Sequence, residues 1–276
     1  MDSKSDSERD SGERKTEFDG ITARGVGALF ALGFLGIVAL AGTTPAQLAD
    51  IPEAADVPVV LLVAAVIVQS SILLVIAVLI GCYTAPRAGL RSHVLERVTR
   101  GTPILPRLRE EFPIAAGLGI AAGLAIVLAE AVLAPTPANA PGSADATIGA
   151  VLASVPLRFL YGGITEELLL RWGFMSLVAF GLWKTVGRTS AEPSSRLMAS
   201  AVTIAAVVFG IGHLPAALAL YGELTPEVVT WIVLGNAIGG LAFGWLFWKR
   251  SLEAAMLAHG FAHVVFVALS LVIVAV

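Results

Sequence analysis

Two adjacent carboxylates and an arginine lie within an otherwise apolar stretch of this 276-residue chain. The stretch reads Ile-Thr-Glu-Glu-Leu-Leu-Leu-Arg over residues 164–171, and its surroundings are rich in Leu, Val, Phe, Gly and Ala. An ionised side chain at the centre of a membrane helix costs about 2.5–3.5 kcal/mol on insertion scales. Charged groups kept at such a depth pair with one another, line a water-filled cavity or take part in chemistry.

The spacing of the three charges predicts that they have different roles. Glu167 and Arg171 are four residues apart on one face of a helix, so we expect them to neutralise each other. Glu166 is rotated by about 100° from Glu167 and faces another surface. Because desolvation disfavours the charged form of an unpaired carboxylate, Glu166 is suited to take a proton from water and later deliver it to a leaving amine. The structural alternative is a salt-bridge cluster of all three residues that orients helices.

Histidines supply further candidate groups. Three of the four in the chain, His213, His259 and His263, fall inside long apolar segments, whereas His93 lies in a polar loop and is expected to be incidental. Ionisable residues inside a membrane are functional candidates, although a single buried histidine is usually a satisfied core residue. His259 and His263 are four residues apart, which suits metal ligation and equally suits two donors directed at one oxyanion. The HExxH pattern of helical zinc proteases is absent from the sequence.

The composition places these residues in an integral membrane protein. Hydrophobic residues make up 57% of the chain and charged residues only 14%, whereas soluble domains carry about 25% charged residues. No segment is basic enough to predict nucleic-acid binding. The single cysteine, Cys82, excludes an intramolecular disulfide and a cysteine-based zinc cluster. Residues 1–22 are polar, acidic and serine-rich, and we expect a disordered cytosolic tail there rather than a signal peptide.

The apolar segments predict an all-α, polytopic transmembrane helical bundle of about seven to eight spans, since a span needs about 20 apolar residues. The predicted spans are residues 25–42, 57–82, 113–134, 160–182, 198–220, 228–248 and 254–275. Because residues 147–182 are too many for one span at the α-helical rise, we expect 148–159 to form a separate interfacial helix or a bent lead-in. Residues 23–146 are assigned to N-terminal transmembrane helices and 147–276 to the region that carries the candidate site.

The loops between the predicted spans alternate in charge. The loop at 83–112 carries six arginines and is expected to form an amphipathic helix on the cytosolic surface. Since basic loops face the cytosol, the N-terminus is predicted to be cytosolic. Glu166 and His213 lie about 24 Å from the cytosolic ends of their helices, but His259 lies only about 8 Å deep. These groups converge only if helices tilt or if the link after Arg250 dips into the membrane.

Three motifs together resemble the CPBP family of intramembrane proteases, which includes the type II CAAX prenyl endopeptidases and the bacteriocin-immunity (Abi) proteins. The motifs are Glu166-Glu167-xxx-Arg171, Phe209-xxx-His213 and His259-xxx-His263, in that order within residues 150–270. The resemblance implies an endopeptidase in which Glu166 activates water, assisted by His213. The two histidines of the last helix would stabilise the tetrahedral oxyanion. Glu167, Arg171 and Phe209 would support the site.

The resemblance leaves the metal requirement open. The family often carries Asn at the position of His263, and histidine can either donate a hydrogen bond or ligate a metal. Glu166, His213, His259 and His263 would make a nitrogen and oxygen shell for zinc, and the family is commonly classed as metalloproteases. We favour water activated by Glu and His without an obligatory metal, and expect no other cofactor. The expected partners are the lipid bilayer and a membrane-associated peptide or lipopeptide, for which the resemblance offers a prenylated CAAX-type protein as one candidate, and not a nucleic acid.

Two other functions fit the same residues. In a transporter or proton-coupled channel, the carboxylates and histidines would form a proton relay, and Glu166→Gln would change flux or its pH coupling. In a non-catalytic immunity or scaffold protein, substitution of Glu166 or His213 would leave the cellular phenotype intact. Cleavage of a peptide by the purified protein separates both functions from the peptidase.

Overall fold

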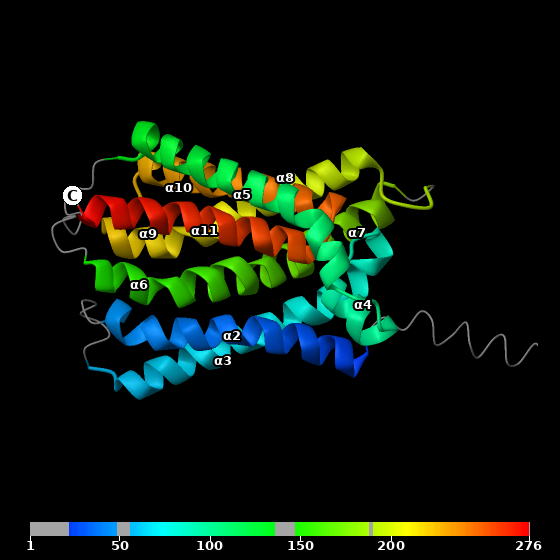
Figure 1. Ribbon diagram of the computed structural model, residues 1–276, viewed down its shortest axis with the longest axis horizontal. Coiled ribbons are helices and arrows are strands. Elements are labelled where there is room, and N and C mark those ends of the chain that lie inside the picture. Colours follow the sequence, from blue (N-terminus) through cyan, green and yellow to red (C-terminus); the bar gives the residue numbers. More distant parts are fainter. Residues whose placement is uncertain (1–21, 49–55, 136–146, 188–189, 276) are drawn as a thin grey trace, which may run out of the picture.

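The described part of the chain comprises residues 22–48, 56–135, 147–187 and 190–275, and its regular structure in this computed structural model is helical, without strands. The long helices lie side by side along the long axis of the molecule (Figure 1). The predicted tail lies outside the described residues except for Thr22. The elements are α2 (Ala23–Leu48), α3 (Val59–Thr84), η2 (Pro86–Ala88), α4 (His93–Arg100), α5 (Leu105–Leu133), α6 (Ile148–Pro156), η4 (Leu157–Glu166), η5 (Leu168–Met175), α7 (Ser176–Thr185), α8 (Ser195–Gly212), α9 (Leu214–Tyr221), α10 (Pro226–Lys249) and α11 (Leu252–Ala275).

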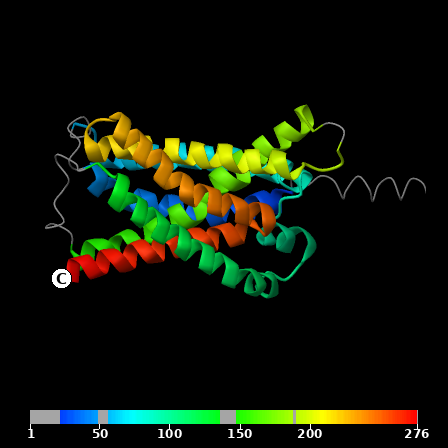
Figure 2. The same ribbon diagram turned by 90° about the horizontal axis from the view of Figure 1, so that it is seen from above.

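Seven helical segments within the described residues are long and apolar enough to cross a membrane. Large apolar side chains on their outer faces, such as Leu61, Leu128 and Ile273, are exposed, as expected where lipid is the solvent. The predicted all-α polytopic bundle is therefore confirmed. We call the end at which α2 and α8 begin and α7 ends the basic end, because its connecting segments carry most of the arginines, and the opposite end the acidic end (Figures 1 and 2).

The helix that carries the two adjacent glutamates is longer than predicted. It runs from Ile148 to Thr185 as one span of 38 residues, and its segments Leu157–Glu166 and Leu168–Met175 are π-helical. A π-helix forms i→i+5 hydrogen bonds, so it fits more residues into each turn, and it is frequent at functional sites. Of the two alternatives predicted for 148–159, the separate interfacial helix is wrong, because α6 continues into the π-helix as a lead-in without a break.

The predicted span at 198–220 is divided at a histidine. Helix α8 ends at Gly212 and α9 begins at Leu214, with His213 between them. Pro215 explains the break, because it has no N–H to donate and its ring clashes with the preceding turn of a continuous helix. His213 therefore lies at a helix junction.

The turn between α10 and α11 lies inside the protein. Ser251 and Leu252 are fully buried and Glu253 is 7% exposed. The backbone N–H of Leu252 donates to the carbonyl of Arg91, 3.1 Å away, in the segment that precedes α4. Because α11 begins beneath this segment and not at the surface, His259 lies deeper than a count of residues from a surface turn suggests. The buried turn thus removes the depth conflict between the motifs.

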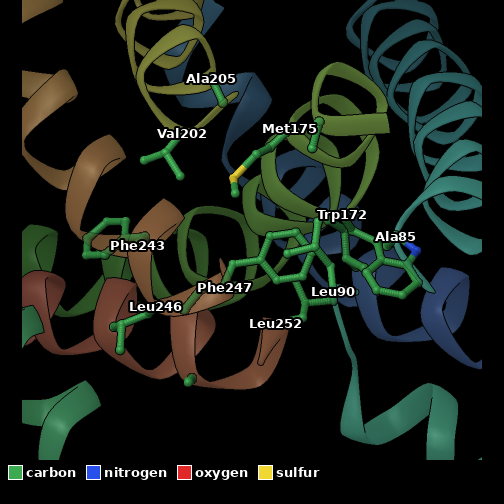
Figure 3. Packing of buried hydrophobic residues seen from close by; sticks show 14 of the residues in the cluster. Ala85, Leu90, Trp172, Met175, Val202, Ala205, Phe243, Leu246, Phe247 and Leu252 are labelled. Atoms are coloured by element: carbon green, nitrogen blue, oxygen red, sulfur yellow. The ribbon is translucent and has the colours of Figure 1, made fainter. Parts of the chain in front are cut away.

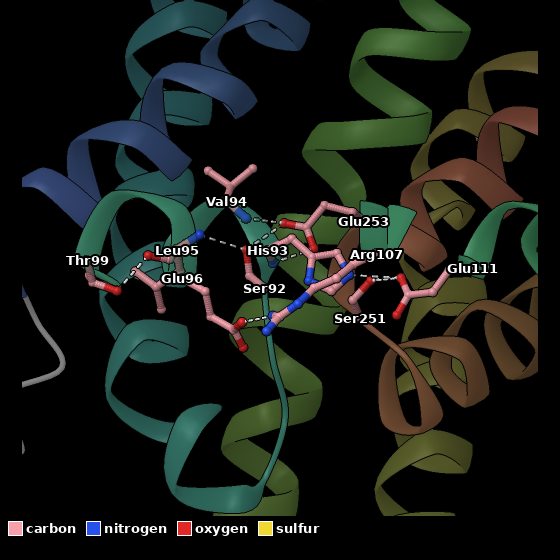
Figure 4. A network of polar contacts seen from close by, with 10 residues as sticks. All are labelled: Ser92, His93, Val94, Leu95, Glu96, Thr99, Arg107, Glu111, Ser251 and Glu253. Atoms are coloured by element: carbon pink, nitrogen blue, oxygen red, sulfur yellow. Dashed lines mark hydrogen bonds and ion pairs between the residues drawn. The ribbon is translucent and has the colours of Figure 1, made fainter. Parts of the chain in front are cut away.

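A polar network fastens α4 over that turn (Figure 4). The carboxylate of Glu253 accepts hydrogen bonds from the Ser92 hydroxyl at 2.6 Å and from the backbone N–H groups of His93 and Val94 at 2.8 and 3.0 Å. It thereby satisfies donors at the start of α4 that have no helical acceptor. His93 is 2% exposed, and its Nε2 lies 3.0 Å from Oε2 of Glu111. The expectation that His93 is incidental is therefore wrong.

Bulky apolar side chains fill the core beside the π-helical segment (Figure 3). Trp172, Phe243 and Phe247 are almost fully buried, and the rings of Trp172 and Phe247 lie 6.1 Å apart. Gly81 of α3 lies directly against Trp172, where any larger side chain would collide with the indole. Interiors packed this closely allow little rotation of a helix, so the core fixes the direction of the charged residues on the same helix.

Candidate active site

The four candidate catalytic side chains line one cavity with a volume of about 610 Å³. Glu166 comes from η4, His213 from the junction of α8 and α9, and His259 and His263 from α11. The remaining wall is largely aromatic and aliphatic, and includes Phe209, Trp231, Phe243 and Phe266. The structure therefore brings together three motifs that are far apart in the sequence. A largely apolar cavity with a few polar groups is typical of a ligand pocket.

Glu167 is the centre of a buried network of charges. Its Oε1 accepts hydrogen bonds from Nη1 of Arg171 and from Nδ1 of His259, each at 2.8 Å. Glu167 and Arg171 are 0% and 1% exposed, so this pair has the geometry that its i, i+4 spacing predicts. Arg171 also donates to the Gly240 carbonyl at 3.3 Å, and its guanidinium carbon lies 4.7 Å from the centre of the Phe209 ring. These contacts join the glutamate helix to α8, α10 and α11.

Glu166 differs from its neighbour in its surroundings. Among the described residues, no donor forms a hydrogen bond or ion pair with its carboxylate. The side chain is partly buried where it lines the cavity. Glu167 is thus bonded to Arg171 and His259, whereas the Glu166 carboxylate is available to a molecule in the cavity. A carboxylate in this position can accept a proton from a water molecule within hydrogen-bond reach.

Two histidine rings are held by hydrogen bonds that define where their protons lie. Nδ1 of His213 is 2.8 Å from the Phe209 carbonyl, and a carbonyl oxygen only accepts, so Nδ1 carries the proton. Nδ1 of His259 likewise donates to Glu167, whose Oε1 already accepts from Arg171. Nε2 of each neutral ring is therefore left as an acceptor. His259 can donate from Nε2 only when the ring is protonated.

His263 has a different environment. Both of its ring nitrogens are buried and neither has a hydrogen-bond partner among the described residues. The ring stacks on His259 with 4.9 Å between centroids. It also packs on Gly162 so closely that a Cβ there would lie 2.5 Å from Nε2. A neutral imidazole always carries one N–H, so His263 keeps a donor for a molecule in the cavity.

The donor set suits zinc by its chemistry but not by its arrangement. No group of three or more His, Cys, Asp or Glu side chains in the described ranges is gathered closely enough to hold a metal ion. His213 and His259 do make the outer N–H bonds that are typical of metal-bound histidines. The same bonds fix a ring and its tautomer when no metal is bound. No step of the reaction is therefore assigned to a metal.

Sequence reasoning missed several residues of the cavity. Arg158 and Tyr161 also line it, and Phe243 stacks on His259 with 4.6 Å between the ring centroids. The sequence signal for Arg158 is a lone charge inside an apolar segment. Phe243 gives no such signal, because nothing local distinguishes it from the other aromatic residues of its helix.

Comparison with protein families gives a match over the helices that form the cavity. Residues 148–265, somewhat less than half of the chain, match the family described as type II CAAX prenyl endopeptidase Rce1-like. Comparison with curated proteins found no match, and neither did comparison with solved structures. The resemblance carried by the glutamate, Phe-His and His-His motifs is confirmed.

Proposed function

Because residues 148–265 match the family described as type II CAAX prenyl endopeptidase Rce1-like, we propose that the chain is an intramembrane endopeptidase that cleaves membrane-associated proteins. The observation that carries the proposal is that Glu166, which has no hydrogen-bond or ion-pair partner in the described part of the chain, meets three histidines in one cavity between membrane-spanning helices. A proton relay for transport also uses such groups. The family match favours peptide hydrolysis over transport.

Glu166 acts as the general base and then as the general acid. A water molecule in the cavity gives a proton to Glu166 while its oxygen forms a bond to the carbonyl carbon of the peptide. The electron pair of the carbonyl double bond moves to its oxygen, which becomes the oxyanion. When that pair returns, the C–N bond breaks and Glu166 gives its proton to the leaving nitrogen. The products are a carboxylic acid, which ionises, and an amine.

The histidines have separate roles that follow from their protons. The free Nε2 of His213 accepts the second hydrogen of the water and orients it. His263 donates its N–H to the oxyanion in its neutral form. His259 donates to the same oxyanion only when its Nε2 also carries a proton, because its Nδ1–H is already donated to Glu167. Glu167 and Arg171 are positioning residues, because they hold His259 and the π-helix without touching the substrate.

The charge of the connecting segments sets the proposed orientation. The basic end carries most of the arginines, so we place it and the N-terminus in the cytosol. The substrate is a protein held at the membrane, and a prenylated peptide of the CAAX type, compared with the same peptide lacking the lipid, is the first substrate to test. This choice comes from the family match alone.

A cleavage assay on the purified full-length protein tests the proposal. Quenched fluorescent peptides and lipopeptides are incubated with the wild type, with Glu166→Gln and with the control Glu192→Gln, which changes an exposed carboxylate outside the spans. We expect cleavage by the wild type and the control and not by Glu166→Gln. Absence of cleavage by the wild type would refute the peptidase and favour transport or scaffolding. A parallel series with a chelator is expected to retain activity, and loss of cleavage there would assign a metal to the site.

A further inference from the structure

Arg158 is a cation on the wall of the cavity and has no counter-ion among the residues that the structure describes. It lines the same cavity as Glu166. Its one polar contact within the described ranges is the hydrogen bond from Nε to the hydroxyl oxygen of Ser154, at 3.0 Å, so its two terminal amino groups have no partner there. Arg171 on the same helix is, in contrast, bonded to Glu167 and to a backbone carbonyl. Arg171, like Glu167, is therefore held in a buried network, whereas Arg158, like Glu166, presents its charge to the cavity.

We propose that Arg158 binds the carboxylate at the free C-terminus of the peptide substrate. The proposal rests on the peptidase function proposed above. A guanidinium in an apolar wall is costly unless an anion or water solvates it, and its planar pair of terminal amino groups matches the two oxygens of a carboxylate. Because Ser154 holds Nε, both terminal amino groups stay available for such a bidentate contact.

The position of Arg158 determines how much of the substrate lies beyond the cleaved bond. Arg158 and Glu166 are eight residues apart in η4, which is about 12 Å at the α-helical rise and less in a π-helix. An extended peptide covers about 3.3–3.6 Å per residue. A carboxylate on Arg158 therefore places the bond beside Glu166 within a few residues of the C-terminus, as the CAAX-type substrate proposed above requires. The released segment lies toward the acidic end, where this helix begins.

The chemistry of the subsite is anion binding, and a lipid phosphate could supply the anion as well as a peptide. We assign the peptide because Arg158 shares one cavity with the groups that would attack its backbone. A lipid phosphate at Arg158 would place a headgroup between the membrane-spanning helices and within reach of the catalytic groups. The two sources predict different behaviour, because only a peptide carboxylate is removed when the C-terminus is amidated.

The test compares two forms of one peptide on the full-length protein in nanodiscs. A quenched farnesylated peptide that ends three residues after the modified cysteine is prepared with a free carboxylate and with a C-terminal amide. We expect the wild type to show a kcat/KM for the acid about 30-fold or more above that for the amide. Arg158→Gln is expected to bring this ratio close to one, and Arg158→Lys to give an intermediate ratio. Arg196→Gln, an exposed arginine at the basic end, keeps the wild-type ratio.

The outcomes separate this inference from the peptidase itself. If the wild type cleaves both peptides equally, Arg158 does not bind the terminus, although the peptidase stands. If it cleaves neither peptide, the peptidase fails and the inference fails with it. The assay is run in phosphatidylcholine with and without phosphatidylglycerol: a dependence on phosphatidylglycerol that Arg158→Gln abolishes, with an unchanged acid-to-amide ratio, would assign the lipid headgroup instead. Unfolding midpoints of both Arg158 variants must match that of the wild type, and the acid-to-amide comparison on the wild type stands without any variant.

Discussion

Glu167 and His259, which are 92 positions apart in the sequence, are joined by a hydrogen bond of 2.8 Å between Oε1 and Nδ1. The same oxygen accepts from Arg171 at 2.8 Å, so one carboxylate carries both the ion pair and the histidine. This bond fixes the proton of His259 on Nδ1 and leaves Nε2 to the cavity. Glu167 therefore takes part both in the buried ion pair that stabilises the bundle and in the orientation of the His259 ring in the candidate site.

Breaking the Glu167–Arg171 pair is expected to destabilise the protein severely. Glu167→Gln and Arg171→Gln each leave one buried charge without its partner, which costs about 3–5 kcal/mol. The double variant removes both charges, so its loss should be smaller than the sum of the two single losses. Denaturant unfolding of the purified protein measures all three. The exposed Glu130 provides a control, because Glu130→Gln should change stability by less than about 0.5 kcal/mol. Strictly additive losses would contradict the pairing.

Glu166→Gln is expected to have the opposite profile. Within the described ranges Glu166 has no hydrogen-bond or ion-pair partner to lose, so the unfolding midpoint should stay near that of the wild type. Loss of the general base should lower kcat by about 10²–10⁴-fold. Stability and rate are measured side by side for Glu166→Gln and Glu167→Gln, because the two variants change adjacent residues in the same chemical way. If Glu166→Gln unfolds the protein as readily as Glu167→Gln, the assignment of separate roles to the two glutamates is wrong.

Substitution of His263 distinguishes hydrogen-bond donation from other roles. Asparagine keeps an N–H donor, whereas leucine of similar size has none. We expect His263→Asn to retain activity within about tenfold of the wild type, and His263→Leu to lose about 10²–10³-fold in kcat, which is typical for removal of one oxyanion donor. A much greater loss in His263→Asn than in His263→Leu would rule out oxyanion donation.

Gly162 is expected to be a sensitive position although it has no functional group. An alanine there would lie 2.5 Å from Nε2 of His263 and would displace that ring. A displacement of about 1 Å in an active site can cost about 10²-fold in rate, so Gly162→Ala should lower kcat with a small effect on stability. Gly181→Ala is the matched control, because apart from the neighbouring backbone of its own helix no atom lies within 4 Å of the added carbon. Equal rates for the two variants would contradict the assigned position of His263.

The sequence predicts the parts of this molecule that depend on local rules. The spans follow from apolar length, and the Glu167–Arg171 pair follows from i, i+4 spacing. The unbroken helix through 148–159 could not be predicted, because π-helical turns depend on packing against other helices. The bond from Glu167 to His259 is non-local in the same sense. Motif order identifies the residues of the candidate site, whereas their meeting depends on where α11 begins.

The buried start of α11 could not be predicted, because it depends on polar residues that have no distinctive pattern in the sequence. Ser251 and Glu253 resemble an ordinary polar turn, and His93 resembles a loop histidine. Their roles become visible only when α4 folds over the turn and buries them together. Polar residues in a short link between two spans are the one local signal that could have indicated a buried connection.

The His93 contact is expected to make the stability of the protein depend on pH. Burial alone would lower the pKa of His93, but the hydrogen bond to Glu111 and the negative charges of Glu253, Glu111 and Glu96 raise it above its usual value of 6.5. The folded state therefore holds a proton on this ring more tightly than the unfolded state does. The stabilisation is complete below about pH 6.5 and is lost as the pH rises through the folded-state pKa.

Comparison of the wild type with His93→Gln measures this effect. The variant should lose about 1.5–3 kcal/mol at low pH, where the charged hydrogen bond is present, and less at about pH 9, where the imidazole of the wild type is neutral. The other charged groups around the ring, Glu96 with its partner Arg107 and Arg250 beside the buried turn, are the same in both proteins, so the difference between the two proteins isolates His93. Because the network fixes the start of α11, the variant should also lose cleavage activity. A difference in stability that grows with pH would mean that His93 is neutral in the folded protein and that Glu111 is held by Ser251 alone.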